Sequence, residues 1–184
     1  MRTSDADILI VPGLGNSGPD HWQTRWEQKL STARRVDQTD WHRPDHASWT
    51  GAVRDAVNAA QKPVILVAHS LGALAVGHAA RDFGAGKVAG AYLVAPPSEA
   101  WLRAHPLELG GFQTHPREPL PFPALLVASR NDPHADYEAT EDLAKAWGAA
   151  LLDAGEAGHI NMDSGHGPWP EGLMSFAGFL NRLT

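Results

Sequence analysis

The sequence predicts an α/β protein with a six-stranded parallel sheet and helices on both faces. Short unbroken apolar runs, such as residues 64–67 and 124–128, are typical of strands that are buried on both sides. Helical patterns alternate with these runs, and that alternation requires crossover connections between parallel strands. The 184 residues contain no internal repeat or linker, so we expect one domain over residues 1–184.

The elements follow one another regularly until the middle of the chain. We expect strands at residues 8–11, 34–38, 64–67, 88–94, 122–128 and 149–152, with the second weak and near a sheet edge. We expect helices at about residues 19–30, 45–60, 71–83, 135–147 and 170–182. Pro19 suits the first turn of the first helix, with Ser17 or Gly18 as its cap.

Residues 96–121 interrupt this regular pattern because they contain six prolines. We expect at most one helical turn there, around residues 99–104. Long irregular connections are often functional, so the segment is either a short lid or rim over a site or a plain surface excursion.

Composition narrows the function classes. The formal net charge is −6 and there is no basic run, which argues against nucleic acid as a partner. No apolar stretch is long enough to cross a bilayer, and the first residues do not read as a signal peptide. The absence of cysteine excludes disulfides, a cysteine nucleophile and thiolate metal sites, and we expect a cytoplasmic location.

The most informative stretch is residues 63–72, where an apolar strand ends in Ala68-His69-Ser70-Leu71-Gly72 and a helical pattern begins at once. This matches a nucleophile elbow, the G-x-S-x-G turn, with Ala68 at the first glycine position. Small residues are needed there because the tight turn presses against the neighbouring strand and helix. The simpler alternative is that Ser70 only caps the helix.

A serine hydroxyl needs a neighbouring base, usually histidine, and the histidine needs an acid that orients it. In an elbow-bearing sheet these residues follow in the order serine, acid, histidine. Asp132 comes after the fifth expected strand and His159 after the sixth, so both lie on the same sheet edge as Ser70. We therefore predict Ser70 as nucleophile, Asp132 as acid and His159 as base.

Other residues compete for these roles. His166 is the alternative base, Asp136 is expected inside a helix, and Asp153 lies on the sixth strand. Strand alternation is expected to turn His69 away from the site, as a packing or support group. The remaining histidines are His21, His42, His46, His78, His105, His115 and His134. No metal-ligand pairing is recognisable among them, so we expect no metal and no cofactor.

The oxyanion of an acyl-transfer intermediate needs two N–H donors. By position these are the N–H of Leu71 and that of Leu14 or its neighbour Gly15, in the glycine-rich loop after the first strand. We expect Gly15, Trp22 and Trp101 to line the substrate site.

With these residues in place, the chain resembles the small serine hydrolases of the retinoblastoma-binding-protein-nine family and its bacterial YdeN-type relatives. The resemblance covers nearly the whole chain and rests on residues 11–15, 21–23, 68–72, 129–133 and 158–161. It implies a compact α/β-hydrolase fold without a large cap domain. It also implies that Ser70, Asp132 and His159 act as nucleophile, acid and base.

We therefore expect a metal-free serine hydrolase that cleaves small esters, with thioesters or amides as further substrates. Because the segment at residues 96–121 has few large apolar residues, among them Leu107, we expect an open cleft that prefers short acyl groups. Two alternatives use the same chain: an acyltransferase with the same residues, and a hydrolase-fold module that binds a protein through Trp41, Trp49 or Trp101.

Overall fold

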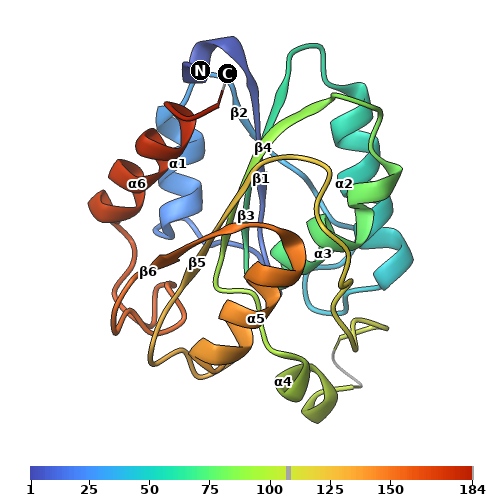
Figure 1. Cartoon of the computed structure of the whole chain (residues 1–184), viewed down its shortest axis with the longest axis vertical. Helices are drawn as coiled ribbons and strands as arrows, with labels where there is room; N and C mark the ends of the chain where they lie inside the picture. The colour runs from blue at the N-terminus through green and yellow to red at the C-terminus, as the bar shows by residue number, and fades with distance from the viewer. Residues whose placement is uncertain (107–108, 184) are drawn as a thin grey trace.

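The computed structural model describes residues 1–106 and 109–183, and it contains the expected parallel sheet with helices on both faces (Figure 1). The strand order is β2-β1-β3-β4-β5-β6, and all neighbouring strands are parallel. The predicted fold class is therefore confirmed. The strands are β1 (Asp7–Val11), β2 (Ala33–Arg35), β3 (Val64–His69), β4 (Val88–Val94), β5 (Ala124–Ala128) and β6 (Ala150–Asp153).

Helices cover the sheet in two layers. Figure 1 shows α1 and α6 on one side of the sheet and α2 and α3 on the other. Short 3-10 turns at Thr3–Asp5 and Ala80–Asp82 complete the regular structure. The helices are α1 (Trp22–Lys29), α2 (His46–Ala59), α3 (Leu71–Ala79), α4 (Glu99–Ala104), α5 (Tyr137–Trp147) and α6 (Pro170–Leu180).

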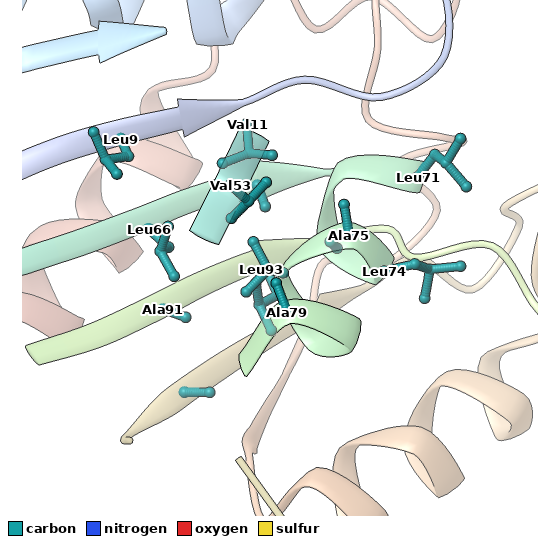
Figure 2. Packing of buried hydrophobic residues seen from close by; sticks show 14 of the residues in the cluster. Leu9, Val11, Val53, Leu66, Leu71, Leu74, Ala75, Ala79, Ala91 and Leu93 are labelled. Carbon is teal, nitrogen blue, oxygen red and sulfur yellow. The ribbon is translucent and has the colours of Figure 1, made fainter. Parts of the chain in front are cut away.

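The central strands are buried on both faces because their side chains alternate between two apolar clusters. Leu66 of β3 packs with residues of α2, α3 and α5, whereas Ile65 and Val67 pack with residues of α1 and α6. Figure 2 shows Leu66 with Leu93 of β4 in the first cluster. Burial of one such side chain stabilises a fold by about 1.5–3 kcal/mol, which explains the unbroken apolar runs in the sequence.

Several predicted boundaries differ from the structure, and three of the differences are informative. The first helix begins at Trp22 rather than Pro19, because the backbone N–H of Gln23 donates to Nδ1 of His21, the residue in the cap position. The second strand is confined to Ala33–Arg35, at the sheet edge as expected. Asp136 stands at the N-cap position of α5 rather than inside that helix.

The proline-rich connection between β4 and β5 contains the expected helical turn, α4. The side chain of Ser98 caps it by accepting from the N–H of Trp101 at 3.2 Å. Leu107 lies outside the described residues. Because all strands are parallel, the loops after β1, β3, β5 and β6 meet at one edge of the sheet, where ligands bind in such folds.

Candidate active site

Ser70 occupies a tight turn between β3 and α3. Its backbone has φ 54° and ψ −128°, a conformation that side chains rarely adopt. The turn needs small neighbours, since a Cβ on Gly72 would overlap the carbonyl oxygens of Val11 and Pro12. Although Ser70 stands at the cap position of α3, its side chain makes no capping bond. The alternative of a simple helix cap is therefore wrong.

The hydroxyl of Ser70 is instead the first member of a hydrogen-bonded chain. Its Oγ lies 2.9 Å from Nε2 of His159. Nδ1 of His159 lies 3.0 Å from each carboxylate oxygen of Asp132. The side chains of His159 and Asp132 are only 7% and 2% exposed, so these hydrogen bonds are shielded from competing water. We call these three residues the Ser–His–Asp array.

Surrounding loops hold the array in place. The backbone N–H of His134 donates to Oδ1 of Asp132 at 2.9 Å, which orients that carboxylate. The ring of His69 lies 4.9 Å from that of His159, and its Nε2 bonds the backbone oxygen of His159 at 2.8 Å. Burial lowers the pKa of His69 well below its ordinary value, with nearby His159 adding to the effect. The neutral ring of His69 therefore supports the loop that carries His159, as expected, but His69 also lines the cavity beside Ser70 rather than facing away from the site.

The competing residues lie elsewhere. Nδ1 of His166 is 3.1 Å from Oγ of Ser164, and this ring lines a different cavity, beside Trp169. Asp153 forms an exposed ion pair with Arg130. The structure therefore brings His159, and neither His166 nor Asp153, to Ser70.

A cavity of about 290 Å³ lies beside Ser70. Leu14 and Leu71 both line it, and within the described parts of the chain neither N–H donates a hydrogen bond. Gly15 does not line the cavity, and its N–H donates to the backbone oxygen of Trp41 at 2.7 Å. Of the two expected donors in the first loop, Leu14 is the available one, and the assignment of Gly15 to the substrate site is wrong.

The predicted tryptophans behave differently from one another. Trp101 lines the cavity as expected. Trp22 does not: it is fully buried, and its Nε1 donates to the backbone oxygen of Ile160 at 2.9 Å. Its ring also packs 5.0 Å from that of Trp169. Trp22 therefore supports the loop of His159 from within the core, because the apolar stripe of α1 faces the sheet.

The surface tryptophans proposed for a protein partner are not exposed. Trp49 is fully buried, and Trp41 and Trp101 are half-buried against the same core.

A buried amide that sequence reasoning missed connects the first loop to the sheet. Gln23 is fully buried in α1, and its Nε2 donates to the carbonyl oxygens that precede the loop and the elbow, those of Val11 at 3.3 Å and Val67 at 3.1 Å. Its Oε1 accepts from the hydroxyl of Ser17 at 2.7 Å. The sequence offers no clear signal for this role, because Gln23 is followed by two further polar residues, Thr24 and Arg25, before Trp26.

Arg35 braces the same loop from outside. Its guanidinium donates to Oδ1 of Asn16 at 2.7 Å and to the backbone oxygen of Ser17 at 2.9 Å. The guanidinium also forms an ion pair with Glu27, in which Nη2 of Arg35 lies 2.8 Å from Oε2 of Glu27. The loop that carries Leu14 is thus tied to β1, β3 and β2 before any substrate binds.

His134 is a second residue that the sequence did not single out. Its ring packs 4.0 Å from that of His159 and 4.6 Å from that of Trp101, and it lines the cavity. Burial lowers the pKa of His134 to about 4, with nearby His159 adding to the effect, so this ring is neutral at neutral pH. Among the described residues, Asp132, His134 and His159 are the one group of three side chains that could hold a metal ion.

This arrangement is suited to acyl transfer. A serine hydroxyl, a hydrogen-bonded imidazole and an orienting carboxylate lie beside a cavity that is also lined by Leu14 and Leu71, whose backbone N–H groups donate no hydrogen bond within the described residues. A family model described as serine hydrolase matches residues 8–178. The chain belongs to the serine hydrolase family. Among curated proteins, none matches this serine hydrolase.

Solved structures agree with this assignment. A YdeN-like hydrolase from Pectobacterium atrosepticum is 36% identical, with a TM-score of 0.84, and the match covers 96% of this chain and 91% of that one. The ydeN product of Bacillus subtilis is 20% identical, with a TM-score of 0.77, over 96% of this chain and 100% of that one. Esterase 2 of Thermogutta terrifontis shares the fold at 17% identity and a TM-score of 0.68, over 100% and 87% of the two chains. The resemblance seen in the sequence is confirmed, and this chain is a serine hydrolase similar to the YdeN-like hydrolases.

No helix of the described residues is both long and apolar enough to span a membrane.

Proposed function

We propose that this serine hydrolase cleaves small carboxylic esters through an acyl-enzyme on Ser70, without a metal. The observation that carries the proposal is the continuous hydrogen-bonded chain from Oγ of Ser70 through His159 to Asp132. A hydroxyl that is strained at an elbow and bonded to an imidazole is ready to lose its proton when it attacks.

The steps follow from these positions. Oγ of Ser70 bonds to the ester carbonyl carbon while its proton passes to Nε2 of His159. The carbonyl oxygen becomes an oxyanion, which the N–H groups of Leu14 and Leu71 stabilise; one such donor contributes about 3–4 kcal/mol to transition-state stability. When the carbon–oxygen bond to the leaving group breaks, His159 returns the proton to the leaving alkoxide. In the second half of the reaction, a water molecule attacks the carbonyl carbon of the acyl-enzyme while His159 takes its proton. The bond between that carbon and Oγ of Ser70 then breaks, His159 returns the proton to Oγ, and the carboxylic acid is released.

Asp132 has an electrostatic and an orienting role. Its carboxylate accepts a hydrogen bond from the N–H at Nδ1 of His159. Nε2 of His159 is then unprotonated, and its lone pair faces Ser70. The same carboxylate stabilises the imidazolium that forms during attack. It does not itself take up a proton.

The test is covalent labelling with a fluorophosphonate probe, followed by mapping of the modified residue. We expect the probe on Ser70, and we expect Ser70→Ala to abolish both labelling and ester hydrolysis with a nearly unchanged melting temperature. Ser4→Ala is the matched control, because Ser4 is an exposed serine distant from Ser70 in the sequence. This variant should be labelled fully. A Ser70→Ala variant that still labels would refute the assignment.

The cavity predicts the size of the acyl group. At about 290 Å³ it lies at the lower end of small-molecule sites, which span about 300–1,000 Å³. Added methylenes gain about 0.8 kcal/mol each only when they are buried. We therefore expect acetyl to butyryl esters to be cleaved better than longer ones.

A chain-length series of chromogenic esters measures this preference as kcat/KM. Trp101→Ala removes one wall of the cavity and should shift the preference toward longer chains. A kcat/KM that rises steadily up to palmitoyl in the unmodified enzyme would contradict the proposed substrate class.

A further inference from the structure

The ring of His134 has no part in the acyl-transfer steps, yet it packs directly on the residue that acts as base. The centroids of the His134 and His159 rings are 4.0 Å apart. Within the described ranges 1–106 and 109–183, neither ring nitrogen of His134 has a hydrogen-bond partner. An imidazole whose ring nitrogens have no hydrogen-bond partner, and which lies beside a carboxylate and a second imidazole, is a potential metal ligand.

The three side chains have nearly the spacing that a metal requires. One ligand atom from each of Asp132, His134 and His159 can be chosen so that all lie within 4.8 Å of one another. Nδ1 of His159 and the carboxylate oxygens of Asp132 are already 3.0 Å apart. Zinc–ligand bonds of about 2.0–2.2 Å in tetrahedral geometry place two ligands roughly 3.3–3.5 Å apart, so the Asp132–His159 pair needs almost no movement.

We propose that Asp132, His134 and His159 bind a divalent transition-metal ion such as Zn²⁺, and that the bound ion holds the hydrolase inactive. Two imidazoles and one carboxylate suit Zn²⁺ better than Mg²⁺ or Ca²⁺, which prefer oxygen ligands. The binding part of the proposal stands on the geometry alone, whereas the inactivation part rests on the proposed function.

Inactivation follows from the position of one proton. In the Ser–His–Asp array, Nδ1 of His159 carries the proton and Nε2 accepts from Ser70. A metal on Nδ1 needs the lone pair of that nitrogen, so the proton moves to Nε2 by way of solvent and no proton is lost. Nε2–H can then only donate to Ser70, and the enzyme has no base that could take the hydroxyl proton.

The test of binding is calorimetric titration of chelator-treated protein with ZnCl₂. We expect one Zn²⁺ per chain, and binding at least tenfold weaker for His134→Gln, which keeps a polar side chain of similar length but is a poor zinc ligand. His105→Gln is the matched control, because the ring of His105 also stacks on Trp101, at 4.3 Å between centroids, and lies outside the three-residue group. His134→Asn replaces His134→Gln if that variant does not fold.

Ser70→Ala makes binding measurable without any hydrolysis and should take up one Zn²⁺ like the unmodified protein. If Ser70→Ala binds Zn²⁺ and the unmodified protein hydrolyses no ester, the proposed function fails and the site stands. Hydrolysis without stoichiometric Zn²⁺ binding overturns the site alone.

The test of inactivation compares each variant with its own metal-free rate. We expect Zn²⁺ to suppress hydrolysis by the unmodified enzyme and by His105→Gln, and EDTA to restore it. His134→Gln should need at least tenfold more Zn²⁺ for the same loss. Equal sensitivity of His134→Gln and the unmodified enzyme would overturn the proposal.

Discussion

The imidazole of His159 can serve Ser70 because its position is defined at both nitrogens and at the backbone. Nε2 faces Ser70 at 2.9 Å, Nδ1 faces Asp132, and the backbone oxygen of His159 bonds His69. The residues on either side, Gly158 and Ile160, have φ values of 58° and 49°, so the loop is sharply bent at this point. A histidine held in this way needs little reorganisation when the proton moves.

At the residue scale, replacement of His159 tests the base directly. We expect His159→Ala to reduce kcat by about three orders of magnitude or more, because only the oxyanion donors and substrate binding then remain. His166→Ala is the matched control from the same loop and should retain kcat within about tenfold, since its ring contacts Ser164. Steady-state kinetics on a short ester measures both, and an inactive His166→Ala with an active His159→Ala would reverse the assignment.

At the element scale, the elbow depends on how closely α3 approaches the loop after β1. A Cβ on Gly13 would lie 2.8 Å from Cβ of Ser70, and one on Gly72 would overlap backbone oxygens of Val11 and Pro12. Backbone cannot move aside as a flexible side chain can. Both glycines are therefore required by the contact between α3 and the end of β1.

A pair of glycine substitutions measures this requirement. Gly72→Ala should destabilise the fold by about 3 kcal/mol or more through steric overlap in the core. Gly178→Ala in α6 is the control, because nothing lies within 4 Å of the added Cβ, and helix propensity should stabilise the protein by about 0.5–1 kcal/mol. Urea unfolding gives both values, and equal stabilities of the two variants would contradict the described contact.

The sequence predicted the elements whose signal is local. The runs that form β3, β4 and β5 are apolar throughout, and the residues that follow β3, β5 and β6 include Ser70, Asp132 and His159. The start of α1 was misplaced because a histidine ring, which is not a common cap, accepts the N–H of Gln23.

Contacts between distant segments were not predictable in the same way. The helical spacing of Trp22 indicated an apolar stripe, but its contact with Trp169 of the last loop exists only in the folded chain. The role of His134 depends likewise on how the loop after β5 meets the loop after β6. The side chain of Gln23 bridges β1 and β3, and the presence of a glutamine in α1 does not by itself specify those partners.

At the scale of the whole molecule, several histidines are buried without a proton. Burial lowers the pKa of His21 from its ordinary 6.5 to about 4, with Arg35 adding to the effect, and burial also lowers the pKa of His69 well below its ordinary value. The unfolded chain takes up protons on these rings as the pH falls below about 6.5, whereas the folded chain does not. Their contribution to stability is therefore fully present above that pH and is lost on acidification.

The expected result is a fall in the free energy of unfolding between neutral pH and the lowered pKa values. His21 alone should account for about 2 kcal/mol at about pH 5, since each pKa unit corresponds to about 1.4 kcal/mol. His21→Asn keeps a cap acceptor for α1 and removes the titrating ring, so its stability should fall less over the same range. Urea unfolding at both pH values measures the difference, and a variant with the same pH dependence as the unmodified protein would contradict this origin.

The cavity beside Ser70 has walls of two different origins. One wall belongs to the strand ends and includes Leu14 and Leu71, while the other belongs to the proline-rich connection between β4 and β5 and includes Trp101 and Leu109. The reacting groups and much of the substrate-facing wall are thus encoded in separate stretches of the chain. After gene duplication, substitutions or exchanges within residues 96–121 can therefore change the substrate, while the catalytic residues at the sheet edge are retained.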